Sequence, residues 1–194
     1  MRRAIEPEGS ALRDSQTPFS DRDRDGDTVP MPTPVTGSAV WTTDLRRRLD
    51  ELLDEYRASL YDSLDGLTED EARLRLVPSK TTLLGLLKHV TYVEGVWFDQ
   101  AISGRSYAEI GISSTPDRSF TLKDADTIAS IQEAHRSRCE VSRRTLAGLT
   151  LDAIVDGRGD RPVWTLQLQV LRELAQHAGH ADILREQVLA RRAH

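Results

Sequence analysis

Four long stretches of this chain carry apolar side chains at every third or fourth residue, and this spacing constrains the fold more than any other feature. Because an α-helix advances about 100° per residue, such spacing gathers the apolar side chains on one face. Three of the stretches end at a glycine, and none shows the alternation that is typical of a β-strand. The pattern predicts helices at residues 41–65, 81–103, 122–147 and 164–190.

Each predicted helix has one apolar face, which must pack against other helices to be removed from water. A chain of 194 residues is long enough for one domain. We therefore expect an all-α protein, an antiparallel four-helix bundle over residues 38–194. Thr42 or Thr43 is expected to cap the first helix, and a capping box at residues 68–71 is expected to open a short helical turn. Residues 104–121 are expected to form a loop that covers one end of the bundle.

Residues 1–37 differ in composition from the rest of the chain. They hold five of the eight prolines and a run of alternating charges at residues 21–27. Such a segment cannot bury enough apolar surface to offset the conformational entropy that ordering would remove. We expect this tail to be disordered, and Met31, close to the predicted domain, is a candidate for the native translation start.

The charge and the cysteine content argue against several classes of protein. Thirty-one acidic and 26 basic side chains give a net charge of −5, so no electrostatic attraction to nucleic acid is expected. No apolar run approaches the roughly 18–20 residues of a membrane span, and no secretory signal is recognisable. Cys139 is the only cysteine, so it has no partner for an intramolecular disulfide, and we expect it to pack as an ordinary buried residue. A cytoplasmic protein is expected.

The fourth predicted helix carries polar side chains on the face that should be buried. On a helical wheel, Glu173 and His180 fall within about 60° of His177, among the apolar side chains of the stripe. Burial of a carboxylate and two imidazoles is unfavourable by several kcal/mol unless they are paired or coordinate an ion. Imidazole nitrogen and carboxylate oxygen are common ligands of divalent metals. The pattern therefore favours a metal site on this face.

A further ligand must come from another helix, and His89 is the best candidate. It lies at the shoulder of the apolar arc of the second predicted helix. His135 lies in the middle of the third predicted helix, and His194 is at the chain terminus. The position of His89 is compatible with the core of a bundle.

Each of these residues also has an ordinary explanation. His89 alone would more often be a hydrogen-bonded packing histidine, and Glu173 with His177 would be an intrahelical pair. For His180, the alternative to a metal ligand is a residue that donates a hydrogen bond to one of the ligands. The coincidence of all four residues on presumed core faces favours the metal site.

The same residues belong to strings that resemble a known family. The second helix contains LLKH, which ends at His89, and the fourth contains ELAQHAGHADILRE, which begins at Glu173. With these motifs the chain is similar to the DinB-like metal-binding bundles, in the branch related to mycothiol-dependent transferases. The similarity covers about residues 41–190.

The resemblance implies a divalent metal, with zinc expected first and nickel or another transition metal as the alternative. Many relatives carry two histidines four residues apart in the fourth helix, followed by Arg-Gly-Gln. Here Glu173 and His177 occupy that spacing, and the thiol-dependent maleylpyruvate isomerases are similar in using a glutamate and a histidine there. The resemblance favours His89, Glu173 and His177 as ligands and leaves open whether His180 is a fourth ligand or supports one.

Three protein ligands leave one coordination position open, which is typical of a reactive site. The resemblance implies an enzyme in which the metal activates a low-molecular-weight thiol of the mycothiol type to attack a small electrophile. The expected reaction is thiol S-transfer or thiol-assisted isomerisation. Asp182 and Arg185 are candidates to bind polar groups of the thiol, and a surface ion pair between them is the alternative. Relatives of this fold commonly pair, so a homodimer is also expected.

Two other functions fit the same residues. If His89, Glu173, His177 and His180 all coordinate, the site is closed, and the metal would stabilise a non-enzymatic binding or structural bundle. If Glu173 acts as a base and not as a ligand, metal-bound water would be the nucleophile of a hydrolase.

Overall fold

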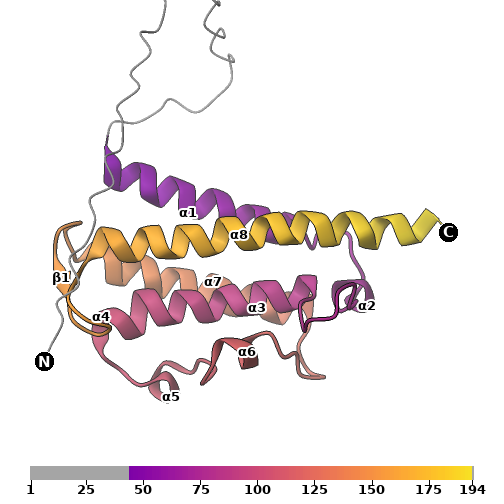
Figure 1. Cartoon of the computed structure of the whole chain (residues 1–194), viewed down its shortest axis with the longest axis horizontal. Helices are drawn as coiled ribbons and strands as arrows, with labels where there is room; N and C mark the ends of the chain where they lie inside the picture. Colours follow the sequence, from indigo (N-terminus) through magenta and orange to yellow (C-terminus); the bar gives the residue numbers. More distant parts are fainter. Residues whose placement is uncertain (1–43, 194) are drawn as a thin grey trace, which may run out of the picture. The chain divides into compact units, whose positions relative to one another are not determined.

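The computed structural model describes residues 44–193. The predicted disordered tail, the candidate start at Met31 and the expected cap at Thr42 or Thr43 lie outside the described residues. Within the described part, the framework consists of four long helices: α1 (Leu45–Asp62), α3 (Leu83–Glu94), α7 (Ile128–Ala147) and α8 (Val163–Ala190). The predicted all-α class and the four-helix bundle are confirmed (Figure 1).

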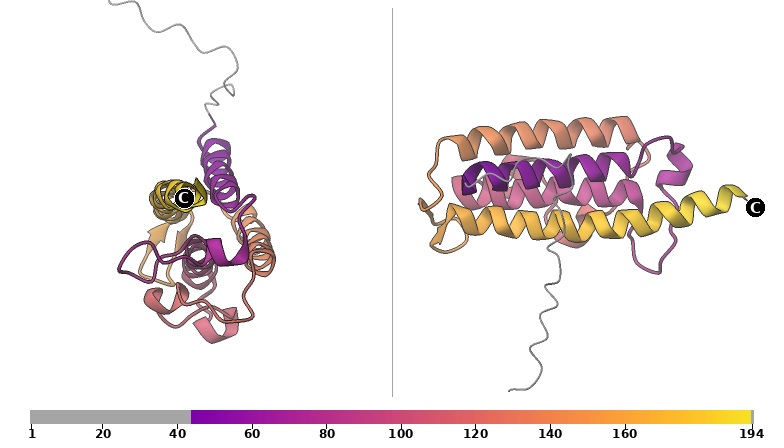
Figure 2. Two further views of the ribbon diagram at one scale, coloured as in Figure 1. Left: turned by 90° about the vertical axis from the view of Figure 1, so that its right-hand side faces the viewer. Right: turned by 90° about the horizontal axis from the view of Figure 1, so that it is seen from above.

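The four helices form two pairs that run in opposite directions (Figure 2). α1 packs against α8, and α3 packs against both α7 and α8. Arg185, near the end of α8, donates to the Ser63 carbonyl just after α1, so α1 and α8 run the same way. Arg46, at the start of α1, donates to the carbonyls of Leu146 and Leu149 around the end of α7, so α7 runs the other way. The long segment between α3 and α7 returns the chain along the bundle and allows these two helices to be parallel.

The second predicted helix contains a wider, π-helical section. α3 continues without a break into the π-helix η1 (Gly95–Gln100) and then α4 (Ala101–Ser103), which ends at Gly104 with a φ of 70°. A π-helical turn uses i to i+5 hydrogen bonds and is frequently found at functional sites. Glu94, the last residue of α3, lies at this transition and is fully buried.

The third helix and the segment before it differ from the prediction. The helix begins at Ile128 and not at residue 122, because Thr127 and Ser130 form a capping box that starts it. Thr127 Oγ1 accepts from the Ser130 amide at 3.1 Å, and Ser130 Oγ accepts from the Thr127 amide at 2.9 Å. The predicted loop at residues 104–121 contains two short helices, α5 (Tyr107–Ile110) and α6 (Pro116–Ser119).

The remaining elements are short. α2 (Glu69–Ala72) begins with the predicted capping box between Thr68 and Glu71. The connection from α7 to α8 contains an antiparallel pair of two-residue strands, which the helical pattern does not predict, and a 3₁₀-helix follows α8. These elements are β1 (Ile154–Val155), β2 (Arg161–Pro162) and η2 (Arg191–Ala193). None of the helices in residues 44–193 is long and apolar enough to cross a membrane.

Gly157, between β1 and β2, lies against the end of α4. Its amide donates to the Ala101 carbonyl at 3.1 Å. A Cβ at Gly157 would lie 2.8 Å from Gln100 O, 2.7 Å from the Ala101 carbonyl carbon and closer still to the Ala101 carbonyl oxygen. Because these are backbone atoms, the clash with an added Cβ can be relieved only by movement of the helix itself. We expect Gly157→Ala to lower the free energy of unfolding by ~1–3 kcal/mol, measured by urea denaturation.

Gly179 in α8 is the matched control, because a Cβ there would meet no atom within 4 Å beyond the neighbouring backbone of its own helix. Gly179→Ala is expected to raise the free energy of unfolding by about 0.5–1 kcal/mol, since alanine is the better helix former. Equal stability of Gly157→Ala and the wild type would contradict the close approach at Gly157.

Candidate metal centre

Three of the four predicted metal ligands lie together between α3 and α8. His89 comes from α3, and Glu173 and His177 come from successive turns of α8. One ligand atom from each of these residues lies within 4.8 Å of the other two. His177 Nε2 is 3.7 Å from Glu173 Oε2, and the centroids of the two imidazole rings are 4.8 Å apart. The group is compact enough for a single ion to contact all three side chains.

The His89 ring is held in one orientation by residues that precede α7. Its Nδ1 atom is 2.7 Å from Ser119 Oγ, and the Ser119 hydroxyl donates its hydrogen to the Pro116 carbonyl at 2.5 Å. Ser119 Oγ must therefore accept a hydrogen from Nδ1, which leaves the lone pair of the neutral ring on Nε2. Phe120 stacks on the ring with the centroids 3.9 Å apart. A metal-binding histidine commonly donates its second nitrogen in this way, which fixes the tautomer that coordination needs.

The two residues of α8 also have potential ligand atoms that make no hydrogen bond in the described part of the chain. Gln169 Nε2 donates to Glu173 Oε1 at 2.8 Å, while Glu173 Oε2 faces His177. His177 Nδ1 is buried and has no hydrogen-bond partner among the described residues. A buried polar atom without a partner is unfavourable by about 1–3 kcal/mol. Two imidazoles and one carboxylate are ligands that suit zinc and related divalent ions, so these residues fit the implied metal.

Burial favours the neutral form of both histidines. It lowers the pKa of His89 to about 3, with a further contribution from the neighbouring His177. Burial also lowers the pKa of His177, although the Glu173 carboxylate opposes this shift. Neutral imidazole is the form that binds a metal, so neither ring has to lose a proton at pH 7. The Glu173 side chain is 23% exposed, so the group is open to solvent on one side.

The fourth predicted ligand, His180, lies outside this group. It is exposed, and its ring centroid is 5.6 Å from that of His177. It stands near the three clustered residues without sharing their burial. Whether it contacts a metal stays a prediction.

The two residues predicted to bind a thiol lie farther along α8. Asp182 is exposed. Arg185 donates to the carbonyls of Ser63 and Asp65 at 2.9 and 2.8 Å, so its guanidinium joins α8 to the segment after α1. Binding of a thiol by Asp182 and Arg185 also stays a prediction.

A second group of ligand-type side chains, which the sequence analysis does not identify, lies between α3 and α7. Glu94, His135 and Cys139 are buried, and their ligand atoms also lie within 4.8 Å of one another. His135 and Cys139 are four residues apart, the same spacing that draws attention to Glu173 and His177. Cys139 is buried as predicted, but its neighbours are polar.

Comparison with known proteins gives one family. A family model described as Mycothiol-S-transferase matches residues 48–190. The matched segment begins within α1 and ends with the last residue of α8, so it includes His89, Glu173 and His177. No curated protein matches the chain.

Proposed function

Because the chain belongs to the mycothiol S-transferase family, we propose that it is an enzyme that joins a low-molecular-weight thiol of the mycothiol type to a small electrophile. Thiol-assisted isomerisation, in which the thiol adds to the substrate and leaves again, is the closely related reaction. The observation that carries the proposal is the convergence of His89, Glu173 and His177 on one point. Conjugation of this kind removes reactive electrophiles and would serve detoxification.

The three residues would hold a divalent ion, zinc by preference, which lowers the pKa of a bound thiol and supplies a thiolate at neutral pH. Ser119 keeps the His89 lone pair available, and Gln169 keeps one Glu173 oxygen directed at His177. With three protein ligands, one position remains for the thiol. The protein needs no nucleophile of its own.

An apolar groove that begins at His180, three residues after His177, offers a place for the electrophile. Its volume is about 310 Å³, and residues before α3 line it together with the outer face of α8. His180 lines this groove, and Ile183 contributes an apolar side chain that is 57% exposed. Apolar side chains around a concave surface are typical of sites for small molecules. We propose that His180 faces the bound substrates from this groove.

The polar part of a mycothiol-type thiol would extend along α8. Asp182 is exposed there and can accept hydrogen bonds from hydroxyl groups. Arg185 is partly engaged by the Ser63 carbonyl, so it would offer the thiol only its remaining hydrogens. We propose both as thiol-binding residues, with the larger effect on thiol affinity at Asp182.

Thiol consumption tests the proposed function. Protein freed of metal with a chelator is mixed with mycothiol and a panel of small electrophiles, before and after addition of Zn²⁺. We expect thiol to be lost only with both electrophile and zinc-loaded protein. Glu173→Gln keeps the shape of the side chain but removes its charge, so we expect it to weaken zinc binding by at least about 10-fold. The reaction should weaken in parallel.

The same assay distinguishes the alternative functions. Turnover of an electrophile by zinc-loaded protein in the absence of thiol would identify a hydrolase and overturn the transferase proposal. Zinc binding without turnover under any condition would identify a non-enzymatic bundle.

A further inference from the structure

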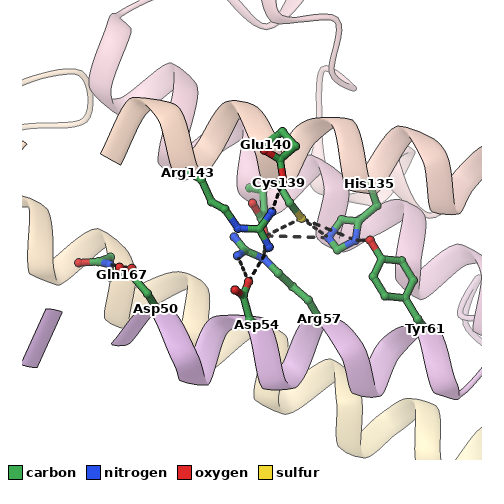
Figure 3. Close-up of polar contacts among 10 residues, drawn as sticks. Asp50, Asp54, Arg57, Tyr61, His135, Cys139, Glu140, Arg143 and Gln167 are labelled. Atoms are coloured by element: carbon green, nitrogen blue, oxygen red, sulfur yellow. Dashed lines mark hydrogen bonds and ion pairs between the residues drawn. The ribbon is translucent and has the colours of Figure 1, made fainter. Parts of the chain in front are cut away.

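The second group of ligand-type side chains is buried deep in the bundle. Glu94 at the end of α3 and His135 on α7 are both 0% exposed, and Cys139, one turn after His135, is 3% exposed. Figure 3 shows His135 and Cys139 directed from α7 toward Arg57 and Tyr61 of α1. A carboxylate, an imidazole and a thiol therefore meet where three helices face one another.

The geometry points to a second divalent-metal site at Glu94, His135 and Cys139, separate from the centre on α8. The Cys139 sulfur lies 3.5 Å from Glu94 Oε1 and 3.6 Å from His135 Nε2, and the latter two atoms are 3.9 Å apart. Tetrahedral zinc, with bonds of ~2.3 Å to sulfur and about 2.0–2.2 Å to nitrogen and oxygen, needs donor separations of about 3.3–3.7 Å. The observed separations are close to these values. Because Glu94 Oε1 also accepts from Arg57, a small rotation of the carboxylate that presents Oε2 would complete three corners of a tetrahedron.

Coordination by His135 would use Nε2, the ring nitrogen that faces Glu94. The Tyr61 hydroxyl lies 2.8 Å from His135 Nδ1, and donation of the Nδ1 hydrogen to Tyr61 would leave the lone pair on Nε2. The Cys139 sulfur lies 3.6 Å from Nε2 and 3.9 Å from Nδ1, so it would have to move toward Nε2 when an ion binds. Support of a metal-binding histidine by a hydrogen bond from its second nitrogen is common.

One carboxylate oxygen of Glu94 is available to bind a metal ion. Its Oε1 accepts from Arg57 Nε at 2.7 Å, but its buried Oε2 has no well-formed hydrogen bond among the described residues. The nearby Ser142 hydroxyl helps to favour the charged carboxylate but is itself without a well-formed partner. A fully buried carboxylate oxygen in this state is suited to a metal ion.

A metal ion at this site would be shared with a cation that is already present. The thiolate is the form of cysteine that coordinates a metal, so the Cys139 proton would leave when the ion binds. Arg57 donates to Glu94 at 2.7 Å, so the ion would share the Glu94 carboxylate with Arg57, which also binds Asp54 at 2.7 Å. Binding should release one proton per ion.

An entry path exists between α1 and α7. A groove of about 470 Å³ is lined by Cys139, Tyr61 and Arg57, together with other residues of these two helices. The released proton and the ion can pass through this groove. Because the donors themselves are almost fully buried, the site would be structural and would join α3 to α7.

Cobalt distinguishes the two sites, because only the second contains sulfur. Metal-free protein is titrated with Co²⁺, and thiolate-to-cobalt charge-transfer absorption is recorded in the near ultraviolet. We expect the wild type to bind about two equivalents and to show this absorption. His89→Ala should bind one equivalent and keep the absorption, whereas Cys139→Ser should bind one equivalent and lose it. Wild-type protein that binds cobalt without thiolate absorption would overturn the second site and leave the α8 centre intact.

A second measurement does not depend on the folding of the Cys139 variant. In His89→Ala, alkylation of Cys139 under mild urea should slow at least tenfold when Zn²⁺ is added. An unchanged alkylation rate at saturating zinc would also overturn the site.

Discussion

Replacing His177 with alanine is expected to remove one metal ion per chain and to lower thiol-transfer activity by at least about 100-fold, which corresponds to ~2.7 kcal/mol in activation free energy. His177 is one of only three side chains in the centre. Without it, the ion would be held by His89 and Glu173 alone, which is too few protein ligands for a zinc site. Metal analysis by mass spectrometry and the thiol-consumption assay measure the two effects. His89→Ala should give the same loss from the other helix.

His180→Ala is the matched control for this prediction. His180 is on the same helix, three residues from His177, but it is exposed and lies outside the three-residue group. We expect this variant to keep its full metal content. A His177→Ala protein that keeps the metal of the wild type would show that the centre is elsewhere.

The α8 half of the centre is predictable from the sequence because both residues share one helix. A spacing of four residues places Glu173 and His177 on one face whatever the rest of the fold does. The assignment of His89 as a ligand is less certain to follow from the sequence, since it depends on which helix packs against α8. Its orientation could not be predicted, because Ser119 lies 30 residues away in a segment without helical periodicity.

The exposure of His180 shows where a helical wheel loses information. The wheel places His180 within about 60° of His177, at the edge of the apolar stripe. The burial of a residue at the edge of a stripe depends on the width of the face that neighbouring helices cover, and a single sequence does not contain that information.

The direction of the helices was not predictable in detail either. Helical periodicity identifies the four long elements, but the path of the chain between them depends on segments such as residues 104–127. The capping box at Thr127 fixes where α7 begins, and two short helices precede it. These elements are formed by caps and turns, whose effect on chain direction depends on tertiary contacts.

The buried group at Glu94 was missed for a related reason. Its residues come from two helices, and Glu94 on α3 is 45 positions before Cys139 on α7. Arg57, which pairs with Glu94, is on a third helix, 37 positions before Glu94. Each residue alone has an ordinary explanation, such as a packing cysteine or a helical histidine. The spacing of His135 and Cys139 was the available signal, but it identifies a site only when the fold supplies Glu94.

The Arg57–Glu94 pair gives the second large expected effect, on stability. Arg57→Met, studied in the presence of a chelator, is expected to lower the free energy of unfolding at pH 7 by about 3–5 kcal/mol, because it leaves a fully buried carboxylate without its main cation. Urea denaturation measures the change. Arg47→Met is the matched control, since the Arg47–Glu51 pair is exposed and should contribute less than about 1 kcal/mol.

The pH dependence of this loss identifies Glu94 as its cause. In the wild type, burial alone would raise the pKa of Glu94, but the charge and hydrogen bond of Arg57 outweigh it and lower the pKa. The stabilisation from the pair is therefore present above the unfolded pKa of about 4.3 and is lost as the pH falls through the folded value. In Arg57→Met, Arg57 no longer opposes the effect of burial, so the pKa of Glu94 in the folded variant is raised. Acidification then protonates Glu94 and removes part of the variant's loss of stability. Relief of the variant reduces the difference in stability between the two proteins as the pH falls from 7 to 4, and loss of the wild-type stabilisation reduces it further below pH 4. A difference that stays constant would mean that Glu94 is not the group left unpaired.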